Sequence, residues 1–248
     1  MIELVYLVHR RVEISASVEE RARACASLKI NGVSAICDPS GGLYLPEQRL
    51  LVVSDLHLEK GAAFARRGQM LPPYDTIETL KILAALIEHY QPETVVSLGD
   101  NFHDRRGSEF LPDDVRAMLN GLIEGRKWIW INGNHDPVGI HGLSGISVDE
   151  YHIDGLIFRH EPSANQVTGE IAGHLHPCAV VRRQGASVRS ACFASDGKRL
   201  LMPAFGTMSG GLDLRHKAFR GLFMQSQLVT YILGKERIYP VRFDRLLA

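Results

Sequence analysis

Short apolar runs that alternate with amphipathic segments constrain the fold of this chain more than any other feature. Leu50–Ser54, Thr94–Leu98 and Lys127–Ile131 are short and largely apolar, as expected of strands in a sheet that is covered on both faces. Between these runs, Asp75–Tyr90 and Asp113–Ile123 place apolar residues at helical spacing. Strands that alternate with helices in this way predict an α/β fold for the first half of the chain.

The second half of the chain has a different pattern. Residues 145–205 contain several strand-like runs and little helical periodicity. Ser195–Lys198 predicts a hairpin turn, and Arg183–Gly185 is a second candidate turn. Leu228–Phe243 has the pattern of two strands around a central turn. We therefore expect an α/β first half and a β-rich second half that are continuous in one domain.

The length of the chain, 248 residues, suits a single large domain. Residues 1–26 are charged and carry no chemical motif. We expect them to form a loosely attached N-terminal extension, and we expect residues 27–248 to form the domain.

The balance of charges limits how the chain could bind nucleic acid. It has 28 Lys and Arg and 28 Asp and Glu residues, so its formal net charge is zero, and its isoelectric point is near 7.2. A strongly basic chain attracts nucleic acid through its phosphates, and this chain has no such global excess. A nucleic-acid substrate would have to be held by a local basic patch or through bound metal ions.

The cysteines and the N-terminal sequence favour the cytoplasm. None of the four cysteines forms a CxxC pair, so their spacing fits neither a thiolate zinc site nor a small disulfide scaffold. The first apolar run is followed, rather than preceded, by positive charge, which is the wrong order for a secretory signal. No segment approaches the ~20 apolar residues that span a bilayer, so we expect no membrane association.

Histidines, carboxylates and an asparagine follow the predicted strands, and they are the groups that carry chemistry. These residues are Asp55, His57, Asp100, His103, Asn134, His135, His160, His174 and His176. Ligands of open α/β sheets bind beyond the carboxyl ends of the strands, so we expect these side chains to converge on one pocket. Gly99, Gly133 and Gly173 precede three of the groups and permit tight turns or close backbone approach.

The types of side chain predict a metal centre. Imidazole, carboxylate and amide groups without thiolate suit divalent Mn, Fe or Zn and are a poor set for Ca. Seven or eight such groups exceed the needs of one ion, whereas two ions ~3.5–4 Å apart that share one carboxylate account for them. Because only Asp55 and Asp100 among the groups named above carry charge, a site with two divalent ions stays positive and attracts a phosphate ester.

The order and spacing of these motifs resemble the calcineurin-like metallophosphoesterase superfamily. The resemblance runs from about residue 50 to residue 177 and includes Asp-x-His, Gly-Asp, Gly-Asn-His-Asp, a single His, and Gly-His-x-His. It implies a four-layer αββα sandwich of two mixed β-sheets flanked by helices. It also implies a hydrolase of phosphoric esters that uses two metal ions. From the ligand types we expect Mn, with Fe or Zn as the other suitable metals, and a hydroxide that bridges the ions as the nucleophile.

The resemblance also implies a role for each side chain. The ligands of the first ion would be Asp55, His57 and His176. The ligands of the second ion would be Asn134, His160 and His174. Asp100 would bridge the two ions, and His135 would contact the substrate phosphate and assist the leaving-group oxygen without binding metal.

His103 indicates the branch of the superfamily. It lies three positions after Asp100, where phosphoprotein phosphatases usually have an acidic residue and DNA double-strand-break repair nucleases have a histidine that neighbours the catalytic one. The resemblance makes His103 a second candidate catalytic residue that contacts the substrate or supports His135, and a purely structural histidine is the alternative. The segments 55–76, 99–107, 173–177 and 203–211 resemble the ligase-associated DNA-damage-response endonuclease family. This closer resemblance implies a DNA substrate and repair partners, namely an ATP-dependent DNA ligase and a helicase.

Several interpretations stay open at this point. Lys60, Arg66 and Arg67 could contact a DNA backbone or could form a solvated helix face. Asp136 either orients neighbouring groups or caps the next helix. The main alternative function is a small-molecule phosphodiesterase or phosphatase that uses the same site, and a non-catalytic scaffold is a third.

Overall fold

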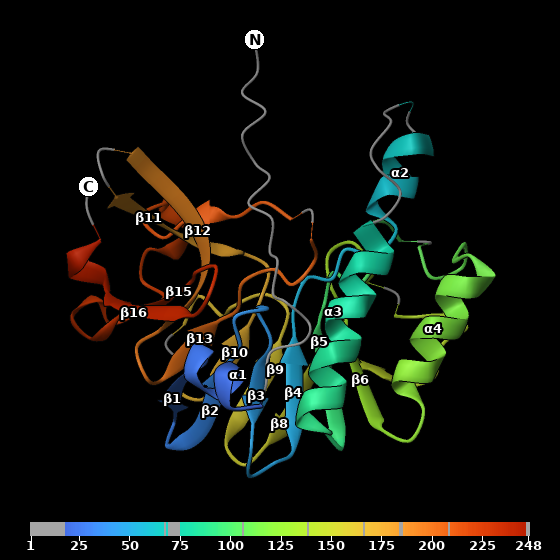
Figure 1. The fold of residues 1–248 in the computed structure, drawn as a ribbon, viewed down its shortest axis with the longest axis horizontal. Coiled ribbons are helices and arrows are strands. Elements are labelled where there is room, and N and C mark those ends of the chain that lie inside the picture. The colour runs from blue at the N-terminus through green and yellow to red at the C-terminus, as the bar shows by residue number, and fades with distance from the viewer. Residues whose placement is uncertain are drawn as a thin grey trace.

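Two β-sheets face each other in the protein, and α-helices cover the outer face of one of them (Figure 1). The computed structural model describes residues 18–66, 68, 75–105, 107–137, 139–165, 167–183, 186–207 and 209–246. Among these residues, every helix is too short or too polar to cross a membrane.

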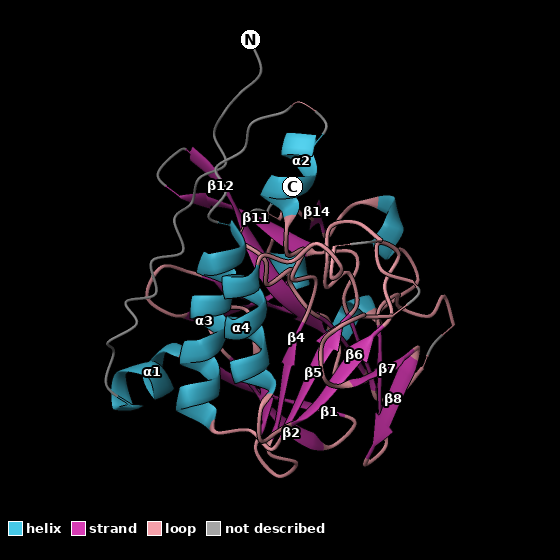
Figure 2. Ribbon diagram, turned by 90° about the vertical axis from the view of Figure 1, so that its right-hand side faces the viewer, coloured by secondary structure: helices cyan, strands magenta, loops and turns pink. Residues whose placement is uncertain are grey.

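The first sheet has seven strands that follow one another in chain order. They are β1 (Ala26–Ile30), β2 (Val33–Cys37), β3 (Leu43–Leu45), β4 (Leu50–Val53), β5 (Thr94–Leu98), β6 (Lys127–Ile131) and β7 (Ile146–Val148). Strands β1 to β4 pair antiparallel, and β4 to β7 pair parallel. The three strands predicted from apolar runs are confirmed as β4, β5 and β6, which end at the same edge of the sheet (Figure 2).

Helices α3 (Asp75–Tyr90) and α4 (Asp113–Ile123) lie side by side against this sheet, which confirms both predicted helices (Figure 2). The apolar stripe of α3, including Leu83 and Leu86, is buried in a cluster with Trp128 and Trp130 of β6. A shorter helix, α2 (Lys60–Arg66), lies beyond the carboxyl end of β4. The parallel strands are therefore covered on both faces, as their continuous apolar runs require.

The second sheet has nine strands and is also mixed. Its main path runs through β14 (Leu212–Asp213), β11 (Pro177–Arg183), β12 (Ala186–Ser195), β13 (Arg199–Leu201), β10 (Glu170–Ala172), β9 (Leu156–Arg159) and β8 (Glu150–Ile153). Off this path, β15 (Val229–Leu233) pairs with β12 and with β16 (Ile238–Arg242). The hairpin turn before Arg199 and the two C-terminal strands are confirmed, whereas residues 184–185 of the other candidate turn lie outside the described residues.

Three clusters of buried apolar side chains pack the layers against one another. One fills the space between the sheets, with Val52 and Val96 facing Phe158 and Phe193. Another is the cluster under α3 and α4. The third covers the outer face of the second sheet, where the segment 214–228 buries Phe219. The two mixed sheets of the predicted sandwich are thus present.

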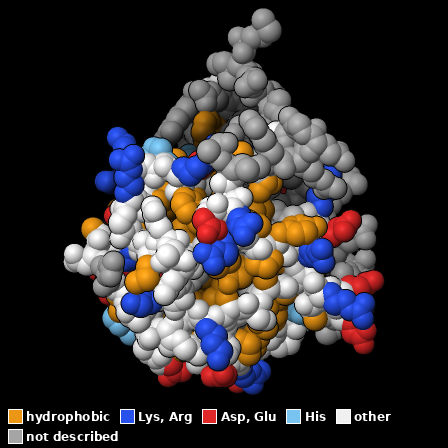
Figure 3. Space-filling view, turned by 90° about the vertical axis from the view of Figure 1, so that its left-hand side faces the viewer, with side chains coloured by type: hydrophobic (Ala, Val, Ile, Leu, Met, Phe, Trp, Pro, Cys, Tyr) orange, Lys and Arg blue, Asp and Glu red, His pale blue; other side chains and the backbone are white. Residues whose placement is uncertain are grey.

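The layer outside the second sheet differs from the one outside the first. In the part of the chain that the structure describes, it is built from loops and the 3-10 helices η1 (Lys217–Phe219) and η2 (Gln225–Gln227). The face around the C-terminal strands mixes hydrophobic and charged side chains (Figure 3). Basic and acidic groups are interspersed there around an apolar strip, in keeping with the zero net charge of the chain. The described chain ends with a third 3-10 helix, η3 (Phe243–Arg245).

Part of the predicted N-terminal extension packs against the domain. Helix α1 (Val18–Ala24) is held by Arg21, whose Nε donates to Asp38 Oδ2 at 2.9 Å in a buried ion pair. Residues 1–17 lie outside the described residues. The division of the chain at residue 26 stays a prediction.

Candidate metal centre

The polar segments after β4 and β5 stay hydrogen-bonded to each other beyond the ends of the strands. The His57 amide donates to the Asp100 carbonyl at 2.9 Å, and the His103 amide donates to the Leu58 carbonyl at 2.9 Å. Parallel pairing therefore continues for a few residues past the apolar runs. As a result, the Asp-x-His motif lies beside the Gly-Asp motif, although the two motifs are far apart in the chain.

The second sheet brings further histidines over these loops. The Gly173 amide donates to the His160 carbonyl at 3.0 Å, and the His174 amide donates to Asp55 Oδ2 at 3.1 Å. A Cβ atom on Gly173 would lie 2.0 Å from Ser54 Oγ, so only glycine permits this approach of the two sheets. The structure therefore brings together four of the predicted motifs, namely Asp-x-His, Gly-Asp, the single His160 and Gly-His-x-His.

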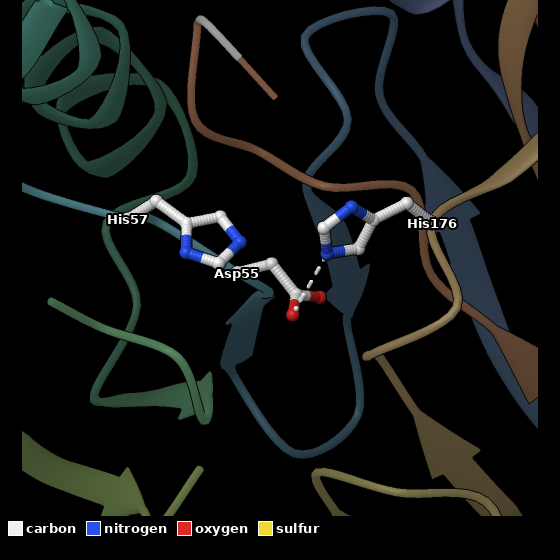
Figure 4. A group of neighbouring side chains, drawn as sticks. All are labelled: Asp55, His57 and His176. Carbon is white, nitrogen blue, oxygen red and sulfur yellow. Dashed lines mark ion pairs between the residues drawn. The ribbon is translucent and has the colours of Figure 1, made fainter. Parts of the chain in front are cut away.

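Asp55, His57 and His176 form the first group of candidate ligands, with their ligand atoms within 4.8 Å of one another. Figure 4 shows the two imidazoles on opposite sides of the carboxylate. His176 Nδ1 lies 3.0 Å from the Gly210 carbonyl, and its Nε2 lies 3.1 Å from Asp55 Oδ1. The Nδ1 atom of His57 is buried and has no hydrogen-bond partner among the described residues. A bound cation would give these buried polar atoms a partner. Imidazole nitrogens and a carboxylate oxygen are ligands that transition metals prefer.

Asp100, His160 and His174 form the second group, again within 4.8 Å. His160 Nδ1 lies 2.8 Å from the Leu98 carbonyl, which leaves Nε2 to face Asp100 Oδ1 at 3.4 Å. His174 Nδ1 lies 3.2 Å from His160 Nε2. A backbone carbonyl on the far nitrogen of an imidazole is the usual way to orient a metal-binding histidine. This group therefore also fits a divalent cation.

The two groups adjoin each other, because His160 Nδ1 of the second group lies 3.8 Å from Asp55 Oδ1 of the first. Together they contain six of the seven predicted ligands. Two adjacent groups of this kind fit a dinuclear metal site. The bridging role of Asp100 stays a prediction.

Asn134, the seventh predicted ligand, lies at the rim of the second group. Its Nδ2 donates to Glu161 Oε1 at 2.7 Å, and the same carboxylate oxygen lies 3.7 Å from His174 Nε2. Glu161 is a site residue that the sequence interpretation missed. Its position directly after His160 was the only available signal, and an acidic residue beside a histidine is too common a pattern to be informative.

Backbone strain is concentrated at the candidate ligands. Five of them have positive φ values, namely Asp55 (52°), His57 (46°), Asp100 (45°), His174 (66°) and His176 (45°). Residues other than glycine seldom adopt this left-handed backbone conformation, and those that do so cluster at functional sites. The surrounding hydrogen bonds hold these residues in a costly conformation that turns their side chains toward one another.

The electrostatics of the centre favour a cation. Burial would raise the pKa of each carboxyl, but the neighbouring His176 lowers the pKa of Asp55, and His160 lowers that of Asp100. Burial lowers the pKa of His57 to about 4. For His160 burial also opposes the charged form, but the hydrogen bond to Asp100 and the charge of Asp55 outweigh it and raise the pKa to about 9. Both carboxylates are therefore ionised at neutral pH and attract positive charge.

The two predicted catalytic histidines lie together beside the ligands. The His135 amide donates to Asp100 Oδ1 at 2.9 Å, and its Nδ1 lies 2.8 Å from the His103 carbonyl. The two imidazoles stack with centroids 5.4 Å apart, and Phe64 of α2 stacks on His103 at the same separation. His135 belongs to neither ligand group and its side chain is exposed, with Nε2 lying 3.9 Å from Asp100 Oδ2.

The predicted basic contacts are described only in part. Lys60, at the start of α2, lines a small pocket with His57, Asp75 and Thr207. Burial lowers the pKa of this lysine. The side chain of Arg66 and the whole of Arg67 lie outside the described residues, so their role stays a prediction.

Solved structures include a nuclease that shares this fold. Nuclease MPE from Pseudomonas putida is 26% identical, with a TM-score of 0.67 over 88% of this chain and 100% of that protein. Yfce, a phosphoesterase from E. coli, is 17% identical, with a TM-score of 0.38 over 78% of this chain and 98% of that one. A comparison with curated proteins gave no match.

The family model described as calcineurin-like phosphoesterase matches residues 48–189, more than half of the chain. The match includes every candidate ligand, from the first strand-end motif after β4 to the Gly-His-x-His motif before β11. The chain therefore belongs to the calcineurin-like phosphoesterase family, and it is a hydrolase that acts on phosphoester bonds.

Proposed function

We propose that this protein is a DNA endonuclease or phosphodiesterase that depends on two divalent metal ions and acts in DNA repair. The observation that carries the proposal is the pair His103 and His135 beside two adjoining ligand groups. The 26% identity to a nuclease that is matched along its whole length supports a nucleic-acid substrate.

In this proposal each of the two ions has its own set of ligands. The first ion would be held by Asp55, His57 and His176, and the second by Asn134, His160 and His174, with Asp100 shared. Bound divalent cations would neutralise charge on the phosphate and activate water for attack. We favour Mn, with Fe or Zn as the other metals that suit imidazole and carboxylate ligands.

His135 would act on the leaving group. Because its Nδ1 is engaged by the His103 carbonyl, the Nε2 atom is the one left to reach a phosphate or a leaving oxygen. A proton delivered there would neutralise the developing alkoxide of a cleaved diester. Lys60 would contact a neighbouring phosphate, because it lines the pocket beside His57.

The test is cleavage of single-stranded, nicked and duplex DNA in the presence of manganese. We expect cleavage that EDTA abolishes and that manganese restores. If no DNA is cut while a small phosphate ester is turned over rapidly, the nuclease proposal is wrong. Co-purification with an ATP-dependent DNA ligase and a helicase would test the proposed repair partners.

A small-molecule phosphodiesterase or phosphatase is the second candidate. The zero net charge favours it, because a chain without excess positive charge has no general attraction for a polyanion. Turnover of bis-(p-nitrophenyl) phosphate against the monoester would separate a diesterase from a monoesterase. A non-catalytic scaffold is the weakest candidate, since it would have no use for strained ligands and an exposed histidine.

A further inference from the structure

We propose that Glu161 is a positioning residue that orients two ligands, Asn134 and His174, toward the second metal ion. The inference rests on the metal centre of the proposed function and is independent of whether DNA is the substrate. Glu161 follows β9 directly after His160, so one strand end supplies both a candidate ligand and the group that orients its neighbours.

The hydrogen bond to Asn134 determines which way the amide faces. A carboxylate only accepts hydrogen bonds, and only the nitrogen of an amide donates them. The 2.7 Å contact with Glu161 Oε1 therefore holds Nδ2 on the Glu161 side. The amide oxygen, which is the atom that can bind a cation, is left facing the other way.

The same carboxylate oxygen lies near His174. Glu161 Oε1 is 3.7 Å from His174 Nε2, whereas Nδ1 of that ring lies 3.2 Å from His160 Nε2 within the ligand group. The ring thus presents Nδ1 to the group and Nε2 to the carboxylate. A carboxylate on the far nitrogen of a metal-binding imidazole fixes its orientation and increases its basicity.

Exposure of the Glu161 side chain argues against a role in folding. It is 57% exposed, so it fills no space in the core. Its contacts instead join two side chains from different loops, one after β6 and one before β11. A carboxylate that accepts a hydrogen bond from one candidate ligand and lies beside another is better explained by the metal centre than by stability.

The experiment measures metal binding by the full chain after metal removal and reconstitution. Glu161→Ala should raise the Kd of one of the two manganese ions about 10- to 100-fold and leave the other Kd unchanged. Glu161→Gln keeps a carbonyl oxygen that can accept from Asn134, so we expect partial rescue. Glu236→Ala removes an exposed glutamate from the β15–β16 turn and is the matched control, expected to bind both ions normally.

A double-mutant cycle with Asn134→Ala separates positioning from a general effect. If Glu161 acts in part through Asn134, the double variant should lose less affinity than the sum of the single losses. Unchanged affinity for both ions in Glu161→Ala would overturn the proposal, as would an equal fall in the Tm of metal-free and metal-loaded protein. Loss of the second ion in a protein whose parent cuts no DNA would refute the nuclease function and support the positioning role.

Discussion

His135 is the residue on which the proposed chemistry most depends. Its side chain is exposed and lies outside both ligand groups, so its removal should leave metal binding intact. We expect His135→Ala to lower kcat about 10²- to 10⁴-fold, because a general acid is lost. Turnover of a phosphodiester and metal content on the same sample check this. Unchanged hydrolysis would show that another group protonates the leaving oxygen.

Gly133 lies so close to the Asp100 backbone that no side chain fits at this position. A Cβ atom there would lie 2.0 Å from the Asp100 amide nitrogen, which is backbone and cannot move aside alone. We expect Gly133→Ala to cost about 1–3 kcal/mol in the free energy of unfolding and to weaken metal binding. Urea denaturation measures the first effect. Gly121→Ala in α4 meets no atom within 4 Å and should be neutral or stabilising, so a similar loss in both variants would contradict the steric argument.

At the scale of elements, Asp136 connects the loops after β5 and β6 through hydrogen bonds. Its carboxylate accepts from the amides of Asn101 at 2.8 Å, Phe102 at 3.3 Å and Gly133 at 3.0 Å. Of the two roles that the sequence left open, orienting neighbouring groups is therefore the one observed. We expect Asp136→Ala to destabilise the metal-free protein by about 1–3 kcal/mol, because buried amides lose their acceptor. Asp136→Asn should lose less of the free energy of unfolding, as measured by urea denaturation. Equal stability of the alanine variant and the parent would show that these hydrogen bonds do not stabilise the loops.

Helix α2 contributes to the centre through Phe64. The Phe64 ring stacks on His103, which in turn stacks on His135. We expect Phe64→Ala to lower kcat about 2- to 10-fold with normal metal content, as the loss of one aromatic contact would allow. Phe64→Tyr keeps the ring and should retain most activity. Equal activity of the alanine and tyrosine variants would show that the stack does not position the histidines.

At the scale of the whole molecule, the centre should link stability to pH when metal is removed. His160 has a pKa raised to about 9, against 6.5 for an ordinary histidine. Its protonated form stabilises the fold fully below pH 6.5, and this contribution is lost as the pH rises to about 9. We expect the metal-free protein to lose up to about 3 kcal/mol over this range.

Urea unfolding at about pH 6.5 and about pH 9 in EDTA measures this loss. His160→Gln should show a smaller decline. Protein with bound manganese should also decline less, because metal binding requires the neutral imidazole. Metal-free stability that is flat or rises over this range would contradict the prediction.

Most of the elements could be predicted because their signals are local. The apolar runs and helical spacing of residues 50–131 predicted β4, α3, β5, α4 and β6 to within a residue. The contacts of Phe64 and Glu161 could not be predicted, because each joins residues that no periodicity relates. Local patterns also could not predict the order of strands in the second sheet or the layer of loops outside it. Both depend on contacts between residues that are far apart in the chain.

The sequence alone determined the kind of chemistry, because the identities and order of the strand-end groups are carried by the chain itself. Imidazole, carboxylate and amide groups after successive apolar runs are enough to predict a metal centre and a phosphoesterase. Only the tertiary structure decided how those groups divide into two sets, which nitrogen of His160 and His176 faces its carboxylate, and which outer groups hold the others in place. The reason is that ligand geometry depends on hydrogen bonds between loops of two different sheets, and these form only when the sheets pack together.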